Sequence, residues 1–169
     1  PDQADFFEWT VGAELDLLDG KGNQWVLRGR HHAFDRQTPL QWKTWLGDYG
    51  SLRGYPAGVL TGDGGSWASI DVRLGWDLWR ALKVPLLKNW GLQPIGFADY
   101  AHSWNKPGLY AAGPEEGVQD WRTNVGFGFG KRFDLPGLGA DNKFRMYAAT
   151  PVGQGREGYG WRFLIAFER

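Results

Sequence analysis

Apolar and polar residues alternate with a period of two along four segments of the chain: residues 7–17, 68–78, 122–133 and 160–168. In the first segment every odd position from Phe7 to Leu17 is apolar, while the even positions include Glu8, Glu14 and Asp16. Such alternation puts apolar side chains on one face of a strand and polar ones on the other. The pattern predicts four β-strands, and weaker versions of it predict three more at residues 24–34, 92–104 and 143–151.

The predicted strands are long and carry charges in mid-strand. Most run 10 to 13 residues, whereas strands of soluble proteins most often have about 5 to 6. A strand of about 9 to 11 residues, tilted by about 45°, spans a bilayer. The polar faces include Asp16, Asp71 and Arg73, which is typical of a barrel with an apolar outside and a polar inside. The sequence therefore predicts an all-β fold: an antiparallel transmembrane β-barrel of about 8 strands, or half of a larger barrel completed by a second chain. Residues 1–169 would form this one domain.

The predicted connections differ in length. Residues 19–23 read as a tight hairpin turn, and residues 79–87 as a short helical turn at the membrane interface. Residues 35–65 form a long loop, where function is expected. Residues 41–48 are the candidate for an eighth strand. Tryptophans near the strand ends, Trp25, Trp67 and Trp104 among them, predict an interfacial aromatic girdle.

Composition removes several function classes. The chain has 26 Gly and 11 Trp but no Cys, so disulfides, Cys-based zinc sites and thiol nucleophiles are excluded. Lys plus Arg and Asp plus Glu both number 19, and a nucleic-acid binder normally has a basic excess. The longest stretches without these charged residues span ten residues, too short for a transmembrane helix.

Catalytic alternatives find little support in the sequence. A Ser-His pair from His102 and Ser103 would lie on opposite faces of one strand, and no Gly-x-Ser-x-Gly motif supports His32 with Ser51. The adjacent His31 and His32 diverge for the same reason and make a poor metal pair. We therefore expect no enzymatic activity, no cofactor and no metal site.

A set of short motifs occurs in a fixed order along the chain. Arg53-Gly54-Tyr55 stands in the long loop, Gly62-Asp63 follows, Asp71 lies in Ile70-Asp71-Val72-Arg73, and Phe97-Ala98-Asp99 comes next. In this order they resemble the bacterial surface-antigen or outer-membrane assembly-factor barrel superfamily, which includes the BamA- and TamA-type insertases and the two-partner-secretion transporters. The resemblance covers nearly the whole chain but only the C-terminal half of a family barrel. Ala101 stands where the family motif has Gly.

The resemblance implies a bacterial outer-membrane protein that inserts or translocates polypeptides. The loop at residues 35–65 would fold toward the lumen and be held there by a set of motif residues: Arg53, Gly54, Tyr55, Asp63, Asp71, Phe97 and Asp99. The closing segment would act as a C-terminal signal for barrel assembly: Gly160, Trp161, Phe163, Ile165 and Phe167. The implied partners are outer-membrane lipid, a client polypeptide, and a homodimer partner or second chain that completes the barrel.

The residues support part of this interpretation on their own. Asp71 and Asp99 both fall on polar faces, where two carboxylates can neutralise the guanidinium of Arg53. The alternative is that Arg53 is simply an exposed loop residue. Two other functions also stay open: a small closed outer-membrane barrel that is structural, adhesive or lipid-modifying, and a soluble ligand-binding barrel.

Overall fold

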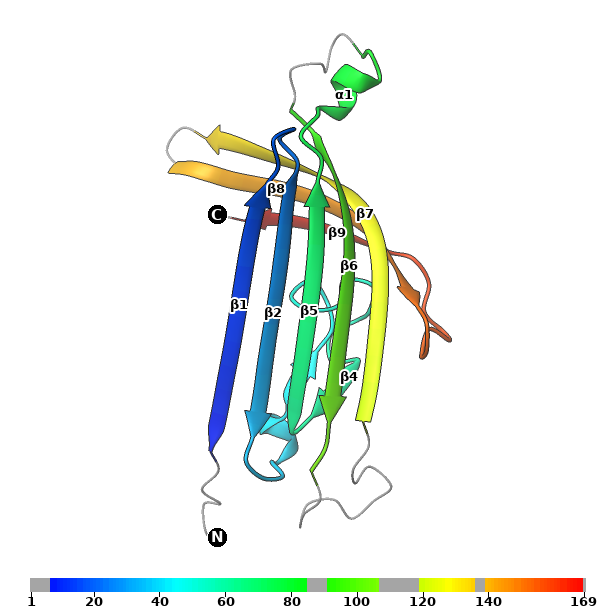
Figure 1. Ribbon diagram of the computed structural model, residues 1–169. Helices are drawn as coiled ribbons and strands as arrows, with labels where there is room; N and C mark the ends of the chain where they lie inside the picture. Colours follow the sequence, from blue (N-terminus) through cyan, green and yellow to red (C-terminus); the bar gives the residue numbers. More distant parts are fainter. Residues whose placement is uncertain (1–6, 85–90, 107–118, 136–138, 169) are drawn as a thin grey trace.

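Seven long strands form one antiparallel sheet in chain order (Figure 1). The computed structural model describes residues 7–84, 91–106, 119–135 and 139–168. The strands of this sheet are β1 (Glu8–Leu18), β2 (Gln24–Phe34), β5 (Gly64–Arg73), β6 (Gln93–Trp104), β7 (Gln119–Leu135), β8 (Gly139–Val152) and β9 (Arg162–Glu168). All seven predicted strands are present, so the all-β antiparallel class is confirmed.

The sheet is open. In the described part of the chain, β1 and β9 are the two edges and do not pair with each other, so the predicted closed barrel of about 8 strands is not formed there. The candidate eighth strand, within residues 41–48, exists only as β3 (Thr44–Leu46). It pairs with β4 (Leu60–Gly62) in a separate two-stranded sheet and is preceded by a 3-10 turn, η1 (Leu40–Trp42).

One strand is shifted from its prediction. The segment expected at residues 68–78 starts earlier, at Gly64, and ends at Arg73. A short helix, α1 (Leu78–Ala81), follows because the carboxylate of Asp77 accepts a hydrogen bond from the Arg80 backbone N–H and begins a helical turn. The helical turn predicted at residues 79–87 is this helix, although residues 85–90 lie outside the described part. Within the described residues, no helix has the length and apolar character needed to cross a membrane.

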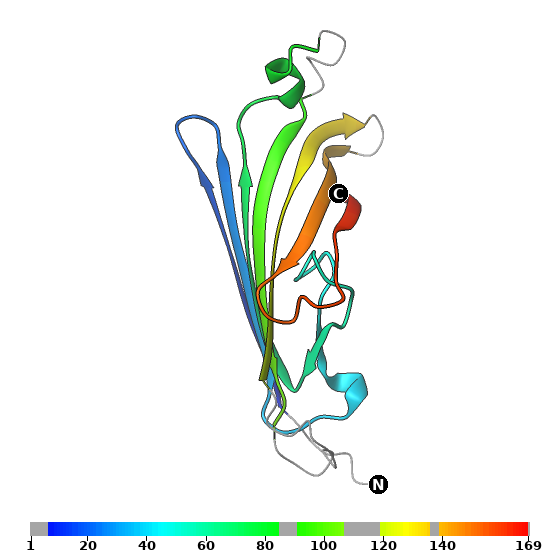
Figure 2. The ribbon, with the colours of Figure 1, turned by 90° about the vertical axis from the view of Figure 1, so that its right-hand side faces the viewer.

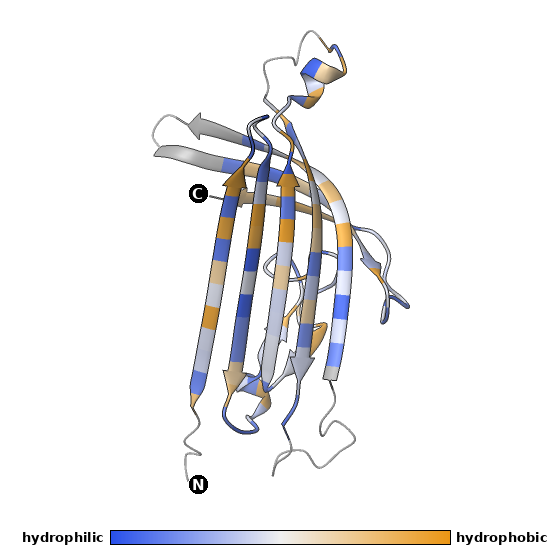
Figure 3. Cartoon of the chain, viewed as in Figure 1, coloured by the Kyte–Doolittle hydropathy of each residue, from blue (hydrophilic) through white to orange (hydrophobic). Residues whose placement is uncertain are grey.

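Cross-strand pairing sorts the side chains onto two faces. One row of paired positions runs through Leu15, Leu27, Ile70, Ala98 and Val125 and is apolar. The adjacent row, on the opposite face, runs through Glu14, Arg28, Ser69, Asp99 and Asn124 and is polar. This alternation is visible along the strands in Figure 3. The sheet therefore has one apolar and one polar face across its width.

The sheet curves (Figure 2), and the polar face is its concave side, because Asp99 and Ser69 of the polar row accept hydrogen bonds from Arg53 in the segment that lies on that side. The segment between β2 and β5, residues 35–63, folds over this side; we call it the inner loop. Buried Leu46, Leu52, Tyr55 and Leu60 of the inner loop pack with Ala101 of β6. The core thus lies between the inner loop and the sheet, and the opposite, convex face of the sheet is left exposed.

The pairing also corrects one tryptophan position. Trp67 pairs with Ala101 and therefore faces the concave side, where it packs against the inner-loop cluster. Trp25 and Trp104 lie on the convex face, in register with Val72 and Gly64. Its place near a strand end predicts Trp67 in the girdle. Nearness to a strand end does not set the face, however, and its odd position in β5 puts Trp67 on the same face as Ser69 and Asp71.

Candidate functional site

Arg53 of the inner loop is the centre of a buried ionic cluster on the concave face. Its Nε donates to Asp99 Oδ2 at 2.9 Å, and its Nη2 lies 2.5 Å from Asp99 Oδ1 and 2.7 Å from Asp71 Oδ1. The Arg53 backbone N–H also donates to Asp99 Oδ2, at 3.1 Å. Arg53 is 5% exposed, and the two aspartates are 2% exposed or less. The guanidinium and its two carboxylates are therefore shielded from water together.

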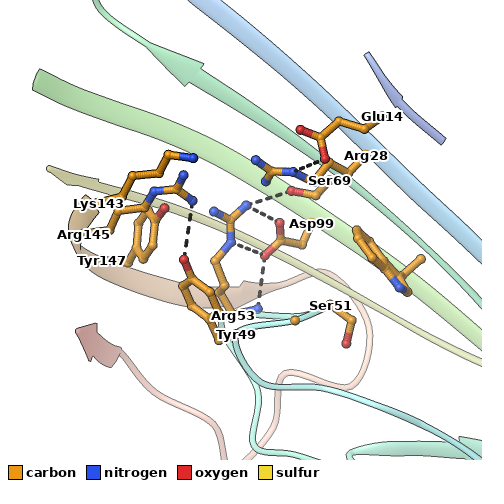
Figure 4. Close-up of a pocket in the computed structure, with 12 residues that line it drawn as sticks. Glu14, Arg28, Tyr49, Ser51, Arg53, Ser69, Asp99, Lys143, Arg145 and Tyr147 are labelled. Carbon is orange, nitrogen blue, oxygen red and sulfur yellow. Dashed lines mark hydrogen bonds and ion pairs between the residues drawn. The ribbon is translucent and has the colours of Figure 1, made fainter. Parts of the chain in front are cut away.

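The strand register brings the two carboxylates together. Asp99 of β6 pairs with Ser69 of β5, and Asp71 lies two residues further along β5, on the same face. Ser69 Oγ accepts from Arg53 Nη2 at 2.9 Å. Neighbouring strands thus supply three acceptor side chains to one guanidinium, and Figure 4 shows Arg53 pointing from the inner loop toward Asp99 and Ser69.

The charges in the cluster stabilise one another. Burial lowers the pKa of Arg53, but the hydrogen bonds and charge of Asp99, followed by those of Asp71, outweigh it and raise that pKa above its ordinary value. Asp71 is also 3.4 Å from Arg28 Nη1, and Asp99 accepts from Asn124 Nδ2 at 2.9 Å. Each carboxylate therefore keeps a second polar partner besides Arg53.

Aromatic rings complete the cluster. The guanidinium carbon of Arg53 lies 3.6 Å above the ring centre of Phe97 and 5.1 Å from that of Tyr147, within the range of a cation–π contact. The Phe97 ring lies across Gly126 of β7, where an added Cβ would come within 2.3 Å of the ring. A side chain at Gly126 would displace the ring from beneath Arg53.

Gly54 and Tyr55, the other two residues of the loop-tip motif, pack the inner loop against the sheet. A Cβ on Gly54 would lie 2.6 Å from the Asn124 Cβ and 3.3 Å from the Thr150 carbonyl carbon, so only glycine fits between the loop tip and β7 and β8. Tyr55 is fully buried, and its hydroxyl donates to the Thr123 carbonyl at 3.4 Å. The Tyr55 carbonyl in turn accepts a hydrogen bond from Arg162 of β9.

Asp63 belongs to a different place. Its Oδ1 accepts from the Thr38 backbone N–H and hydroxyl, both at 2.9 Å, and its Oδ2 accepts from the Lys106 backbone N–H at 2.8 Å. These contacts tie the base of the inner loop to the segment after β6. Asp63 is therefore a second anchor of the loop, separate from the Arg53 cluster.

The predicted C-terminal signal lies on and just before β9. Phe163, Ile165 and Phe167 alternate onto the convex face and are 80%, 65% and 74% exposed. Gly160 and Trp161 precede the strand and are also exposed. None of these residues contributes to the Arg53 cluster.

Two of the three histidines make polar contacts with neighbouring side chains. His32 Nδ1 lies 2.6 Å from Thr44 Oγ1, and its Nε2 lies 3.0 Å from Glu8 Oε1, which links β1 and β2 to the inner loop. His31 contacts Ser66 on the convex face. His102 and Ser103 point to opposite faces. Among the described residues, no three acidic or histidine side chains gather as a metal site.

A cavity of about 360 Å³ adjoins the Arg53 cluster (Figure 4). Its lining is largely polar and comes from the concave faces of β1, β2, β5, β6 and β8 as well as from the inner loop; it includes Glu14, Arg28, Tyr49, Ser69, Lys143 and Arg145. Tyr49 accepts from Arg145 Nη1 at 3.4 Å and packs near Tyr147. The inner loop thus leaves part of the concave face open instead of filling it.

Several residues of the site were not anticipated from the sequence. Asn124, Tyr147 and Arg162 all fall on the polar face of the alternation, which is the only sequence signal they carry. Their contacts depend on where the inner loop lies across β7, β8 and β9, and no local pattern encodes that position.

Comparison with known proteins adds nothing to these residues. No family model, no curated protein and no solved structure matches the chain.

Proposed function

We propose that this chain is a lipid-facing wall of a bacterial outer-membrane β-barrel that inserts or translocates polypeptides. The observation that carries the proposal is the convex face. Every strand of the sheet exposes at least one large apolar side chain on this face, and these include Val11, Leu15, Phe127, Met146 and Phe163. A soluble monomer rarely exposes an apolar patch above a few hundred Å². Lipid is the environment in which such a face is stable.

The charge distribution supports the same environment. Within the described convex positions of the sheet, Lys131, near one end of β7, is the only residue of the Asp, Glu, Lys and Arg group. The concave face carries Arg28, Asp71 and Asp99 within the strands and Arg73 at the end of β5. A charge on the lipid side of a barrel costs about 2–4 kcal/mol at the bilayer midplane, and this segregation avoids that cost.

The role in polypeptide transport is supported by the inner loop and the open edges. Arg53 holds the loop tip inside the curved sheet. The motifs that contribute to this contact occur along the chain in an order that resembles the assembly-factor barrels. The unpaired edges of β1 and β9 can pair with further strands. A barrel with a held inner loop and an open seam has both a polar interior and an edge on which a client strand can form.

The lipid-facing part is tested by reconstitution. The chain is refolded into vesicles of phosphatidylethanolamine and phosphatidylglycerol that contain brominated acyl chains, and quenching of tryptophan fluorescence is measured. We expect strong quenching and β-sheet circular dichroism. A chain that stays folded in buffer without quenching would instead be a soluble barrel.

The transport part is tested with the same vesicles. We expect them to accelerate folding of an unfolded outer-membrane barrel client, measured by the shift in gel mobility. Arg53→Ala should remove this acceleration. Arg30→Ala, which removes an exposed guanidinium from the same face, should retain it. Equal client folding with and without the chain would refute the transport role and leave a structural barrel.

A further inference from the structure

Among the described residues no strand pairs with the outer edge of β1, and this edge has a direction, a charge and an amphipathic pattern that together describe its partner. From these, and on the basis of the proposed barrel, we propose that β1 docks an antiparallel strand that alternates apolar and basic residues. This strand belongs to a segment that contributes an odd number of strands, greater than one, and not to a second copy of these seven strands.

The number of strands fixes the direction of both edges. Seven strands pair antiparallel in chain order, so successive strands alternate in direction and β1 and β9 run the same way. A partner that closes the barrel with antiparallel seams must begin and end on strands of the opposite direction. Its strand number is therefore odd.

A second copy does not meet this requirement. In the same membrane orientation, its β1 and β9 also run in the direction of the first copy, so both seams would be parallel. Bacterial outer-membrane barrels are antiparallel throughout. A β1–β1 pair would be antiparallel, but it would invert one copy across the membrane and place two concave-facing rows, each with three acids and no base, beside each other.

The inner loop sets a lower limit on the size of the partner. A barrel of about 8 strands has an interior just wide enough for its own side chains. Here the concave side holds the inner loop, with Leu52, Arg53 and Tyr55 all buried against the sheet. One additional strand would therefore leave too little room, and the partner must contribute at least three.

The β1 edge also specifies the side chains that it accepts. Along Glu8–Leu18 the concave-facing row carries three acids, Glu8, Glu14 and Asp16, and no base, and all eleven residues are exposed. The neighbouring strand β2 partly neutralises these acids, because Glu14 is 3.3 Å from Arg28 and Glu8 is 3.0 Å from His32. Opposite charges on directly paired residues stabilise a sheet. The docking strand is therefore basic on its concave side and apolar on its convex side.

Two synthetic peptides of eleven residues test this inference, one alternating valine with lysine and the other valine with glutamate. The chain is held in zwitterionic dodecylphosphocholine micelles, so that the detergent itself has no net charge. We expect the lysine peptide to bind at least fivefold more tightly, by fluorescence anisotropy, and to slow amide hydrogen exchange along β1. Equal binding of the two peptides, or protection elsewhere than in β1, would overturn the proposal.

Charge variants identify the row responsible. Glu14→Gln combined with Asp16→Asn should remove the preference for the lysine peptide. Glu157→Gln, which neutralises an exposed acid outside the edge, should keep it. A preference that persists in the double variant would assign the selectivity to another surface and refute the docking site.

Crosslinking tests the exclusion of a second copy. The chain has no cysteine, so Leu15→Cys on β1 and Ile165→Cys on β9 can be introduced singly and the two variants mixed in vesicles. We expect no disulfide between copies under oxidation, and efficient β1–β9 or β1–β1 crosslinking would overturn the proposal. Failure of this proposal can be distinguished from failure of the proposed function. Absence of tryptophan quenching by lipid would reject the lipid-facing wall, whereas quenching without peptide selectivity would reject only the docking site.

Discussion

The buried ion cluster predicts a large loss of stability when Arg53 is replaced by alanine. The substitution removes the hydrogen bonds from Nε and Nη2 to Asp99 and Asp71, at 2.5 to 2.9 Å. Both carboxylates stay in place with almost no exposure to water. Breaking a buried pair by removal of one partner costs about 3–5 kcal/mol because it leaves uncompensated buried charge.

The remaining contacts place the expected value near the lower end of that range. Asp71 retains Arg28 at 3.4 Å, and Asp99 retains Asn124 and the backbone N–H of residue 53. We therefore expect Arg53→Ala to lower the free energy of unfolding by about 3–4 kcal/mol. Urea titration in micelles, followed by tryptophan fluorescence, measures this change. Limited proteolysis of the inner loop gives an independent local readout.

A double-mutant cycle separates the ion pair from general disruption. Asp99→Asn keeps the shape of the side chain but removes its charge. The variant with both substitutions should be more stable than the sum of the single losses predicts, by about 1–3 kcal/mol. Arg30→Ala is the matched control and should change stability by less than about 0.5 kcal/mol. A loss below about 1 kcal/mol for Arg53→Ala, with unchanged loop protection, would refute the buried lock, because exposed ion pairs contribute only that much.

Three further substitutions test the packing of the loop and the two faces. Gly54→Ala should destabilise the chain by about 1–3 kcal/mol in urea titration, since its Cβ would lie 2.6 Å from the Asn124 Cβ; Gly50→Ala, with no atom within 4 Å of its Cβ, should be neutral, and equal effects would contradict the close approach. Phe127→Arg on the convex face should reduce the free energy of folding into vesicles by about 2–4 kcal/mol; a loss that is the same in buffer would argue against lipid contact. Asp63→Ala should expose the base of the inner loop to protease and cost about 1–3 kcal/mol, because buried backbone N–H groups lose their acceptor; an unchanged digestion pattern would contradict this anchor.

The secondary structure was largely predictable because it depends on local pattern. Alternation located all seven long strands, since one apolar face and one polar face require a period of two along each strand. The boundary errors fall where alternation carries no information: α1 begins at the Asp77 cap inside the predicted strand, and β5 starts at two glycines that have no side chain to alternate. Alternation alone also predicts Asp71 and Asp99 on polar faces, and the pairing puts them on the same one.

Only the tertiary structure decided what those faces enclose. The motif series in the sequence groups Asp63 with Arg53, Asp71 and Asp99. In the structure Asp63 lies apart from the other three, because it accepts a hydrogen bond from Thr38 at the base of the loop. Closure was also beyond the sequence. Alternation sets the face of each side chain, while closure depends on curvature, on strand number and on pairing between distant edges. The amino-acid sequence thus determined an amphipathic antiparallel sheet, and the fold decided that it is open, with Arg53 locked on its concave side and two edges that run in the same direction.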